Sequence, residues 1–388
     1  MAVGITCWTV FVLLGVSQNC FAEEANFAYQ LRHFLGVRHP EAPSNKPLTE
    51  ARDYIKEQFK QYGLDLEINQ FTTDIYTNSQ KNSVAGENIV GVARGHAGGP
   101  VLLVGADYDS NLEQSPLENN GAGVAAMLEV AGSYMAATRQ QYRRASTVLF
   151  VAFDLNTKEY ENTRVRYGPP GSYHFLHQWL WPFINQSVDN FAGAIILDSI
   201  TRFSTENSSQ HLPRGFETAF REANQEIRTR GKKGDFLALF STGSSAAQHL
   251  ARTIIANYNE DPKASKLRLQ ELRVLTNRSV GDSLHMFNHQ AQFHFWTFQP
   301  SDEPMSLPAV LLTDTDVYRK SGEVCEEDCS VEVFLTQTRQ DALGLVSTTL
   351  TNALLQLQTA GGGSTGLTVA PAFVVSTLVA SILVLFNW

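Results

Sequence analysis

Two hydrophobic periods alternate along this chain. Residues 47–63 place Ile55, Phe59 and Tyr62 at positions i, i+4 and i+7, which predicts an amphipathic helix. Residues 64–73 alternate apolar and polar side chains instead, which predicts a strand with one buried face. We therefore predict a helix followed by a strand over residues 47–73.

Continuous apolar runs of strand length recur further along the chain. Such runs are typical of parallel strands that are buried on both faces. We predict strands at 88–94, 101–108, 146–154, 191–199 and 308–314. Helical periodicity falls between these runs, at 122–135, 172–180, 213–229, 244–258 and 331–358. This alternation predicts an α/β fold, doubly wound, with a mostly parallel central sheet flanked by helices.

Acidic residues end the predicted buried strands. In open α/β sheets, ligands bind beyond the carboxyl ends of the strands. Each of these residues taken alone is typical of an aspartate that caps a loop, but their shared position favours a common cleft. The five residues are Asp107, Asp109, Asp154, Asp198 and Asp314.

Charge narrows the range of partners. The 388 residues carry a net charge of -9, and no basic run occurs among them. Nucleic-acid surfaces need clustered Lys and Arg, so we expect no nucleic-acid partner.

The amino terminus has the features of a secretory signal peptide. Residues 4–16 form an apolar run that is short for a bilayer span, and Cys20-Phe21-Ala22 after it form a plausible small-residue cleavage site. We expect cleavage after Ala22, which makes residues 1–22 a signal peptide.

The carboxyl terminus predicts a lipid anchor. Small residues, a polar spacer and an apolar tail follow one another over 360–388, in the order of a glycosylphosphatidylinositol (GPI) attachment signal. No Lys or Arg follows Arg339, although a spanning helix usually carries basic residues on its cytoplasmic side. A plain membrane helix remains the alternative. The candidate attachment residues are Gly361, Gly362, Gly363 and Ser364.

Cysteines and glycosylation sequons agree with an extracellular protein. After signal cleavage the chain keeps Cys325 and Cys329, which we expect to form one local disulfide. A metal pair would need more ligands nearby. Asn185, Asn207 and Asn277 each begin an N-glycosylation sequon. We therefore expect a glycoprotein that is held on the outer face of the plasma membrane.

Seven segments resemble one known family. The segments "GENIVGVARG", "GPVLLVGADYDS", "NNGAGVAAMLEVA", "VLFVAFD", "GSYHFL", "AIILDS" and "LPAVLLTDTDVYR" resemble the metallopeptidase family 28. That family includes di-zinc aminopeptidases and glutamate carboxypeptidases, and the glutaminyl cyclases share its fold. The resemblance implies a single peptidase-like α/β domain over residues 23–359.

The resemblance also implies a site. Active members of the family bind two zinc ions through five side chains: a His two residues before an orienting Asp, a bridging Asp, a Glu, a second Asp and a second His. A neighbouring Glu is the general base. Two zinc ions need a bridging carboxylate and imidazole ligands to activate one water, and the base takes the proton of that water.

This chain departs from the family pattern at most of these positions. Asp107 stands where the first His would be, and Asp109 matches the orienting Asp. Asn119 stands in place of the bridging Asp, whereas Asp198 matches the ligand Asp. The second His falls near Val324, where no imidazole is close in sequence. One of the five expected ligands therefore survives.

The Glu pair is also missing. It falls on Asn156 and Thr157, so the general base is lost. Glu159 or Glu161 would supply a carboxylate if the loop were shifted by two to four residues. Glu159 is accordingly the substitute that an active enzyme would need.

Other ligands would have to come from late in the chain. His285, His289 and His294 would reach the cleft only from a late loop, and surface or packing roles are the simpler interpretation. The remaining site residues offer oxygen atoms alone, which suit a hard cation such as Ca²⁺ better than zinc. We expect no cofactor, with zinc or another divalent cation as the alternative.

Three functions compete. The first is a GPI-anchored pseudopeptidase that binds an extracellular peptide or protein ligand. The second is an active zinc-dependent exopeptidase with the unusual ligands Asp107, Glu159 and Asp198. The third, an acyltransferase of the glutaminyl cyclase type, needs the same missing Glu, so the first hypothesis is favoured.

Overall fold

The computed structural model describes most of the chain. The described residues are 23–77, 80–96, 99–112, 114–139, 144–156, 165–274, 290–301, 305–320 and 329–360. Several predictions fall on residues outside these ranges: the signal peptide, Thr157, Glu159, Glu161, Asn277, His285, His289, Val324, Cys325 and the GPI signal from Gly361 onward. Within the described ranges, no helix has the length and hydropathy that a membrane crossing requires.

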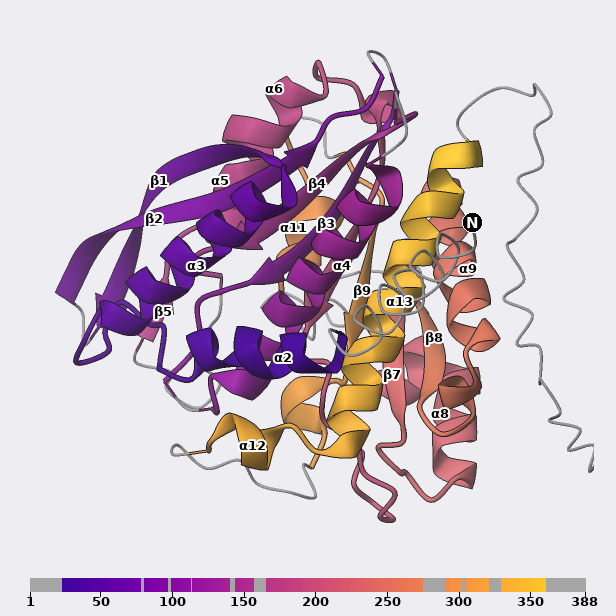
Figure 1. Cartoon of the computed structure of the whole chain (residues 1–388). Coiled ribbons are helices and arrows are strands. Elements are labelled where there is room, and N and C mark those ends of the chain that lie inside the picture. The colour runs from indigo at the N-terminus through magenta and orange to yellow at the C-terminus, as the bar shows by residue number, and fades with distance from the viewer. Residues whose placement is uncertain are drawn as a thin grey trace, which may run out of the picture.

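One mixed sheet organises the described part of the chain (Figure 1). Its nine strands lie in the order β5-β1-β2-β4-β3-β6-β9-β7-β8. The central strands β4, β3, β6 and β9 are mutually parallel, as are β7 and β8, and antiparallel pairs flank them. The strands are β1 (Asp65–Thr77), β2 (Gln80–Ala93), β3 (Val101–Asp107), β4 (Thr147–Phe153), β5 (Val165–Tyr167), β6 (Phe191–Asp198), β7 (Phe236–Thr242), β8 (Arg268–Val274) and β9 (Ala309–Thr313).

Helices cover both faces of the sheet, so the predicted α/β class is confirmed. One layer, in front in Figure 1, holds α2 (Glu23–Leu31), α3 (Lys46–Tyr62), α4 (Ala122–Thr138), α9 (Ser245–Glu260) and α13 (Gln337–Ala360). The other layer holds α5 (Gly171–Phe175), α6 (Trp181–Phe183), α7 (Phe216–Ala219), α8 (Arg221–Thr229) and α11 (Ala291–Trp296). The short helix α12 (Val331–Phe334) packs with the first layer.

The β3 strand shows why the central strands are apolar throughout. Leu102 and Val104 face the α4 layer, whereas Val101 and Leu103 face the opposite layer. Successive side chains of a strand point to opposite faces, so a sheet covered on both sides needs apolar residues at every position.

Two of the predicted helices are broken. The segment 213–229 divides at Phe220, whose φ of -131° and ψ of 58° are not helical, into α7 and α8. The segment 331–358 divides after Phe334, because Leu335 has a ψ of 64°, into α12 and α13. Strands β5, β7 and β8 were not predicted.

Buried ion pairs connect the loops at the carboxyl edge of the sheet. Glu118, before α4, accepts hydrogen bonds from Arg202 Nε at 2.9 Å and from Arg339 Nη2 at 2.8 Å. Arg202, after β6, also reaches Asp316 Oδ1, after β9, at 3.0 Å. All four side chains are buried, so each charge depends on its partners for the stabilisation that water would otherwise supply.

We expect Arg202→Met to lower the free energy of unfolding by about 3–5 kcal/mol, because it leaves Asp316 and part of Glu118 buried without their cation. Arg94→Met is the matched control, since Arg94 also bridges two carboxylates, those of Asp65 and Glu67, but is exposed. The Arg94→Met substitution should lower the free energy of unfolding by less than about 1 kcal/mol. Urea unfolding measures both losses, and equal losses would contradict a structural role for the buried cluster.

Candidate functional site: a carboxyl and amide cluster at the strand ends

Three neighbouring parallel strands bring the predicted site residues together. Asp107 ends β3, Asp198 ends β6, and Asn156 follows β4. Asn119 lies in the short π-helical segment η2 (Leu117–Gly121) that leads into α4. All four side chains are buried. These four positions therefore lie at one edge of the sheet.

Asn120 attaches the Asn119 loop to the end of β6. Its Nδ2 donates to the Leu197 carbonyl oxygen at 2.9 Å, and its Oδ1 accepts from the Ser199 amide at 3.0 Å. The peptide bond between Asn119 and Asn120 is cis. A Cβ at Gly123 would lie 2.2 Å from Asn120 Oδ1, so only glycine leaves room for this amide.

The Asn156 amide occupies one side of the Asp107 carboxyl group. Asn156 Nδ2 donates to Asp107 Oδ2 at 3.0 Å. The orientation of this amide is set by Ser172, whose backbone N–H donates to Asn156 Oδ1 at 3.3 Å and whose hydroxyl also donates to that oxygen. Because a backbone N–H can only donate, the NH₂ group must face Asp107.

Gln290 makes the equivalent contact to Asp198. Its Nε2 donates to Asp198 Oδ2 at 2.7 Å. Gln292 Nε2 donates to Gln290 Oε1 at 3.2 Å, which holds the Gln290 NH₂ group toward the carboxyl group. Each of the two carboxyl groups thus receives a hydrogen bond from a neutral amide.

Burial dominates the electrostatics of the cluster. It raises the pKa of Asp107 well above the usual range, and the neighbouring Asp109 and Asp198 raise it further. Burial, followed by the nearby Asp316, raises the pKa of Asp198 to about 8. Burial also raises the pKa of Asp314 to about 6, partly offset by nearby arginines. The folded site therefore favours protonated carboxyl groups.

The donor set does not fit the zinc ions that the family pattern implies. Asp107 Oδ1 and Asn119 Oδ1 are buried and have no hydrogen-bond partner among the described atoms. The opposite oxygens of Asp107 and Asp198 instead face amide hydrogens, which a cation would repel. Within the described ranges, no group of three or more His, Cys, Asp or Glu side chains could hold a metal ion.

Asp154 and Asp314, two of the five strand-end aspartates, make contacts that are typical of loop caps. Asp154 pairs with Arg52 at 3.0 Å and accepts from the Glu87 amide at 2.9 Å. Asp314 Oδ2 accepts from the Thr201 and Arg202 amides at 3.0 and 2.7 Å. Both contacts match the loop-capping interpretation, and the Asp154 pair takes that residue out of the expected common cleft.

Other predicted residues lie apart from the cluster. His294, in α11, lines a separate cavity of about 680 Å³ together with Tyr173 and His177. The described sequons Asn185 and Asn207 are exposed, as glycan attachment requires. Cys329 is described without Cys325, so their disulfide stays a prediction.

Ser172, Gln290 and Gln292 were missed by the sequence analysis. Ser172 lies inside the segment "GSYHFL", and its position as the first residue of a predicted helix gave no sign of a contact to Asn156. Gln290 is 92 residues away from Asp198 in sequence, and no motif marks it.

The fold of this chain is shared with solved proteins. Its described structure aligns with glutaminyl cyclases of Porphyromonas gingivalis (13% identity, TM-score 0.54, 86% of this chain and 98% of the other) and Macrostomum lignano (14%, 0.54, 87% and 88%). It also aligns with a zinc aminopeptidase from Bacillus subtilis (10%, 0.51, 86% and 95%). At such identities the likeness shows a shared zinc aminopeptidase-type fold.

Sequence comparison finds one family match within the chain. The family model of Peptidase family M28 matches residues 88–255, from β2 to α9, which confirms the resemblance to metallopeptidase family 28. This range contains Asp107, Asn119, Asn156 and Asp198. No curated protein matches the chain in sequence.

The raised pKa values predict that stability falls as pH rises. The folded pKa of Asp198 lies above the usual Asp value of 3.8, so the folded state holds its proton more tightly than the unfolded chain. The resulting stabilisation is complete below about pH 4 and is lost as pH rises to about 8.

Urea midpoints of the wild type and Asp198→Asn at pH 5 and pH 8 measure this loss. The wild type should lose more stability than the variant between the two values. Asp65→Asn, at an exposed position, should retain the wild-type slope. An equal change in urea midpoint between pH 5 and pH 8 for the wild type and Asp198→Asn would contradict a buried, protonated carboxyl group at Asp198.

Proposed function

We propose that this protein is a non-catalytic pseudopeptidase of the M28 fold that is GPI-anchored at the cell surface and acts in binding or recognition. One observation carries the proposal: neutral amides, those of Asn156 and Gln290, donate hydrogen bonds to the carboxyl groups of Asp107 and Asp198. Amide donors thus supply at these carboxyl groups the stabilisation that metal ions would supply in a di-zinc site.

The chemistry of peptide hydrolysis also lacks its main groups. Asn156 stands at the position of the general base, and its amide takes up no proton near neutral pH. Asn119 is neutral, so it cannot bridge two cations as a carboxylate does. General acid-base catalysis alone contributes about 10²–10⁴ in rate, and its loss argues against turnover.

A binding role agrees with what the chain keeps. The strand-end loops are held by buried ion pairs through Glu118, Arg202 and Arg339, so the edge of the sheet is rigid without a metal. A rigid edge is the preorganised surface that recognition needs. The ligand that we propose is an extracellular peptide or protein.

Purified mature protein tests the proposal against an active zinc exopeptidase. We expect far less than one zinc ion per chain by elemental analysis after dialysis, and neither aminopeptidase nor glutaminyl cyclase turnover with added zinc. Stoichiometric zinc, together with turnover that a chelator abolishes, would establish the enzyme instead.

Asp107→Asn gives an independent test through stability. The substitution removes a buried acid but keeps an oxygen that can accept the Asn156 hydrogen bond, so we expect a higher melting temperature at pH 8. A metal ligand would behave in the opposite way, because its loss would lower the melting temperature and the metal content together. Differential scanning calorimetry with and without a chelator separates the two outcomes.

The cell-surface part of the proposal rests on the terminal signals and the sequons. Phosphatidylinositol-specific phospholipase C should release the full-length protein from intact cells, because it cleaves GPI lipids. Replacing Gly361, Gly362, Gly363 and Ser364 together with bulky residues should abolish this release. Retention of the wild-type protein on treated cells would favour a spanning tail.

A further inference from the structure

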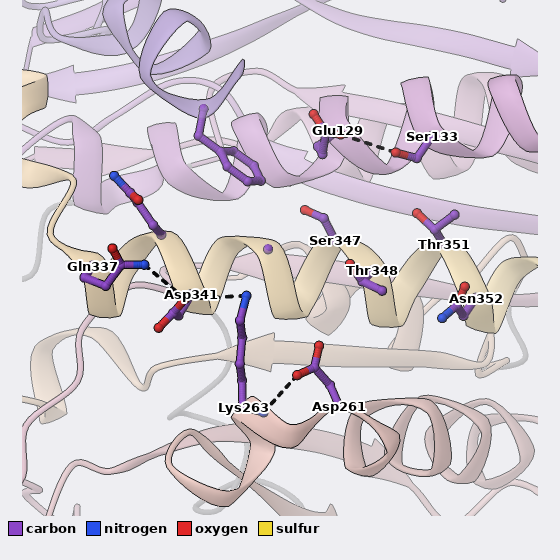
Figure 2. A pocket seen from close by; sticks show the side chains of 13 residues that line it. Glu129, Ser133, Asp261, Lys263, Gln337, Asp341, Ser347, Thr348, Thr351 and Asn352 are labelled. Atoms are coloured by element: carbon purple, nitrogen blue, oxygen red, sulfur yellow. Dashed lines mark hydrogen bonds and ion pairs between the residues drawn. The ribbon is translucent and has the colours of Figure 1, made fainter. Parts of the chain in front are cut away.

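A cavity of about 400 Å³ lies on the helical layer, apart from the strand-end site (Figure 2). Its walls come from α4, from α13 and from the short 3-10 helix η5 (Pro262–Ser265). It shares no lining residue with the cluster at Asp107, Asn119 and Asp198. Whatever it binds, it would bind independently of the degenerate peptidase site.

Two residues that line this cavity carry buried hydroxyl groups without hydrogen-bond partners among the described atoms. Ser347 is 4% exposed and Thr351 is 8% exposed, and neither Ser347 Oγ nor Thr351 Oγ1 has a partner among the described atoms. They lie one helical turn apart on α13, and Figure 2 shows both side chains on the side of α13 that faces α4. Buried polar groups are normally satisfied, so this pair marks a place for a ligand's polar atoms.

The charges on the walls favour a cation. The cavity is lined by three carboxylates, Glu129, Asp261 and Asp341, against one ammonium group, that of Lys263. Lys263 already pairs with Asp341 at 3.4 Å. The net negative charge of these walls would repel an anionic ligand and attract a cationic one.

Glu129 is the carboxylate on the α4 wall opposite the two hydroxyl groups (Figure 2). Gln30 Nε2 and Ser133 Oγ donate hydrogen bonds to it at 3.4 and 3.3 Å. A charged donor would make a shorter and stronger hydrogen bond to this carboxylate.

We propose that this cavity binds a small aliphatic amine. A protonated amine carries up to three N–H donors and no acceptor, so it needs several oxygen acceptors around it. Glu129 supplies the negative charge, and the hydroxyl oxygens of Ser347 and Thr351 supply neutral acceptors. The Phe27 ring, at the same cavity, offers an apolar surface to the methylene chain.

Calorimetric titration of the mature protein with spermidine tests this site. We expect saturable binding that weakens with salt, and a Glu129→Gln variant that binds on the order of tenfold more weakly, because a charge-assisted hydrogen bond is lost. Asp65→Asn removes the same charge at an exposed position and should bind as the wild type does. Equal weakening by the two variants would show non-specific attraction to an acidic protein and would overturn the proposal.

Ser347→Ala separates binding from folding. Removing a buried hydroxyl group without a partner should leave the unfolding midpoint unchanged or higher, while spermidine binding weakens. Unchanged binding in both Ser347→Ala and Glu129→Gln would overturn the proposal. So would equal binding of xylitol, a neutral polyol, or the absence of saturable spermidine binding by the wild type.

Discussion

The carboxyl edge of this protein depends on how its buried carboxyl groups are neutralised. Parallel strands β3, β6 and β9 end side by side, so the acidic residues that follow them gather in one poorly solvated region. Like charges at such a place must be protonated, paired or bound to a metal. In this chain, arginines form ion pairs with Glu118 and with Asp316. Asp107 and Asp198 instead accept hydrogen bonds from amides, and their raised pKa values favour the protonated, neutral form.

This arrangement holds the strand-end loops of the fold in place through contacts within the protein. The ion pairs from Arg202 and Arg339 hold the loops after β3, β6 and β9 in place. Asn120 fastens the loop that would carry the bridging ligand to β6. The frame of the site is thus stabilised by contacts that do not involve a metal.

Sequence patterns predicted the central strands of the fold. The apolar runs at β3, β4, β6 and β9 are informative because a strand covered on both faces needs apolar residues at every position. The edge strand β8 was missed because its sequence RLQELRV mixes charged and apolar residues, and β7 was missed although it is apolar.

The partners of the site residues could not be predicted in the same way. Asp107, Asn119, Asn156 and Asp198 follow strands, so their shared edge is a consequence of topology. Gln290 reaches Asp198 across 92 residues and Arg339 reaches Glu118 across 221 residues, and neither belongs to a local motif. Such contacts depend on how loops and α13 fold back, which no short-range pattern encodes.

Anomalous X-ray diffraction at the zinc absorption edge, from crystals of the mature protein grown with stoichiometric zinc, tests the central claim most directly. The account predicts no anomalous peak at the ends of β3 and β6, and amide groups of Asn156 and Gln290 in contact with the two carboxyl groups. A peak within coordination distance of Asp107 and Asp198 would contradict it.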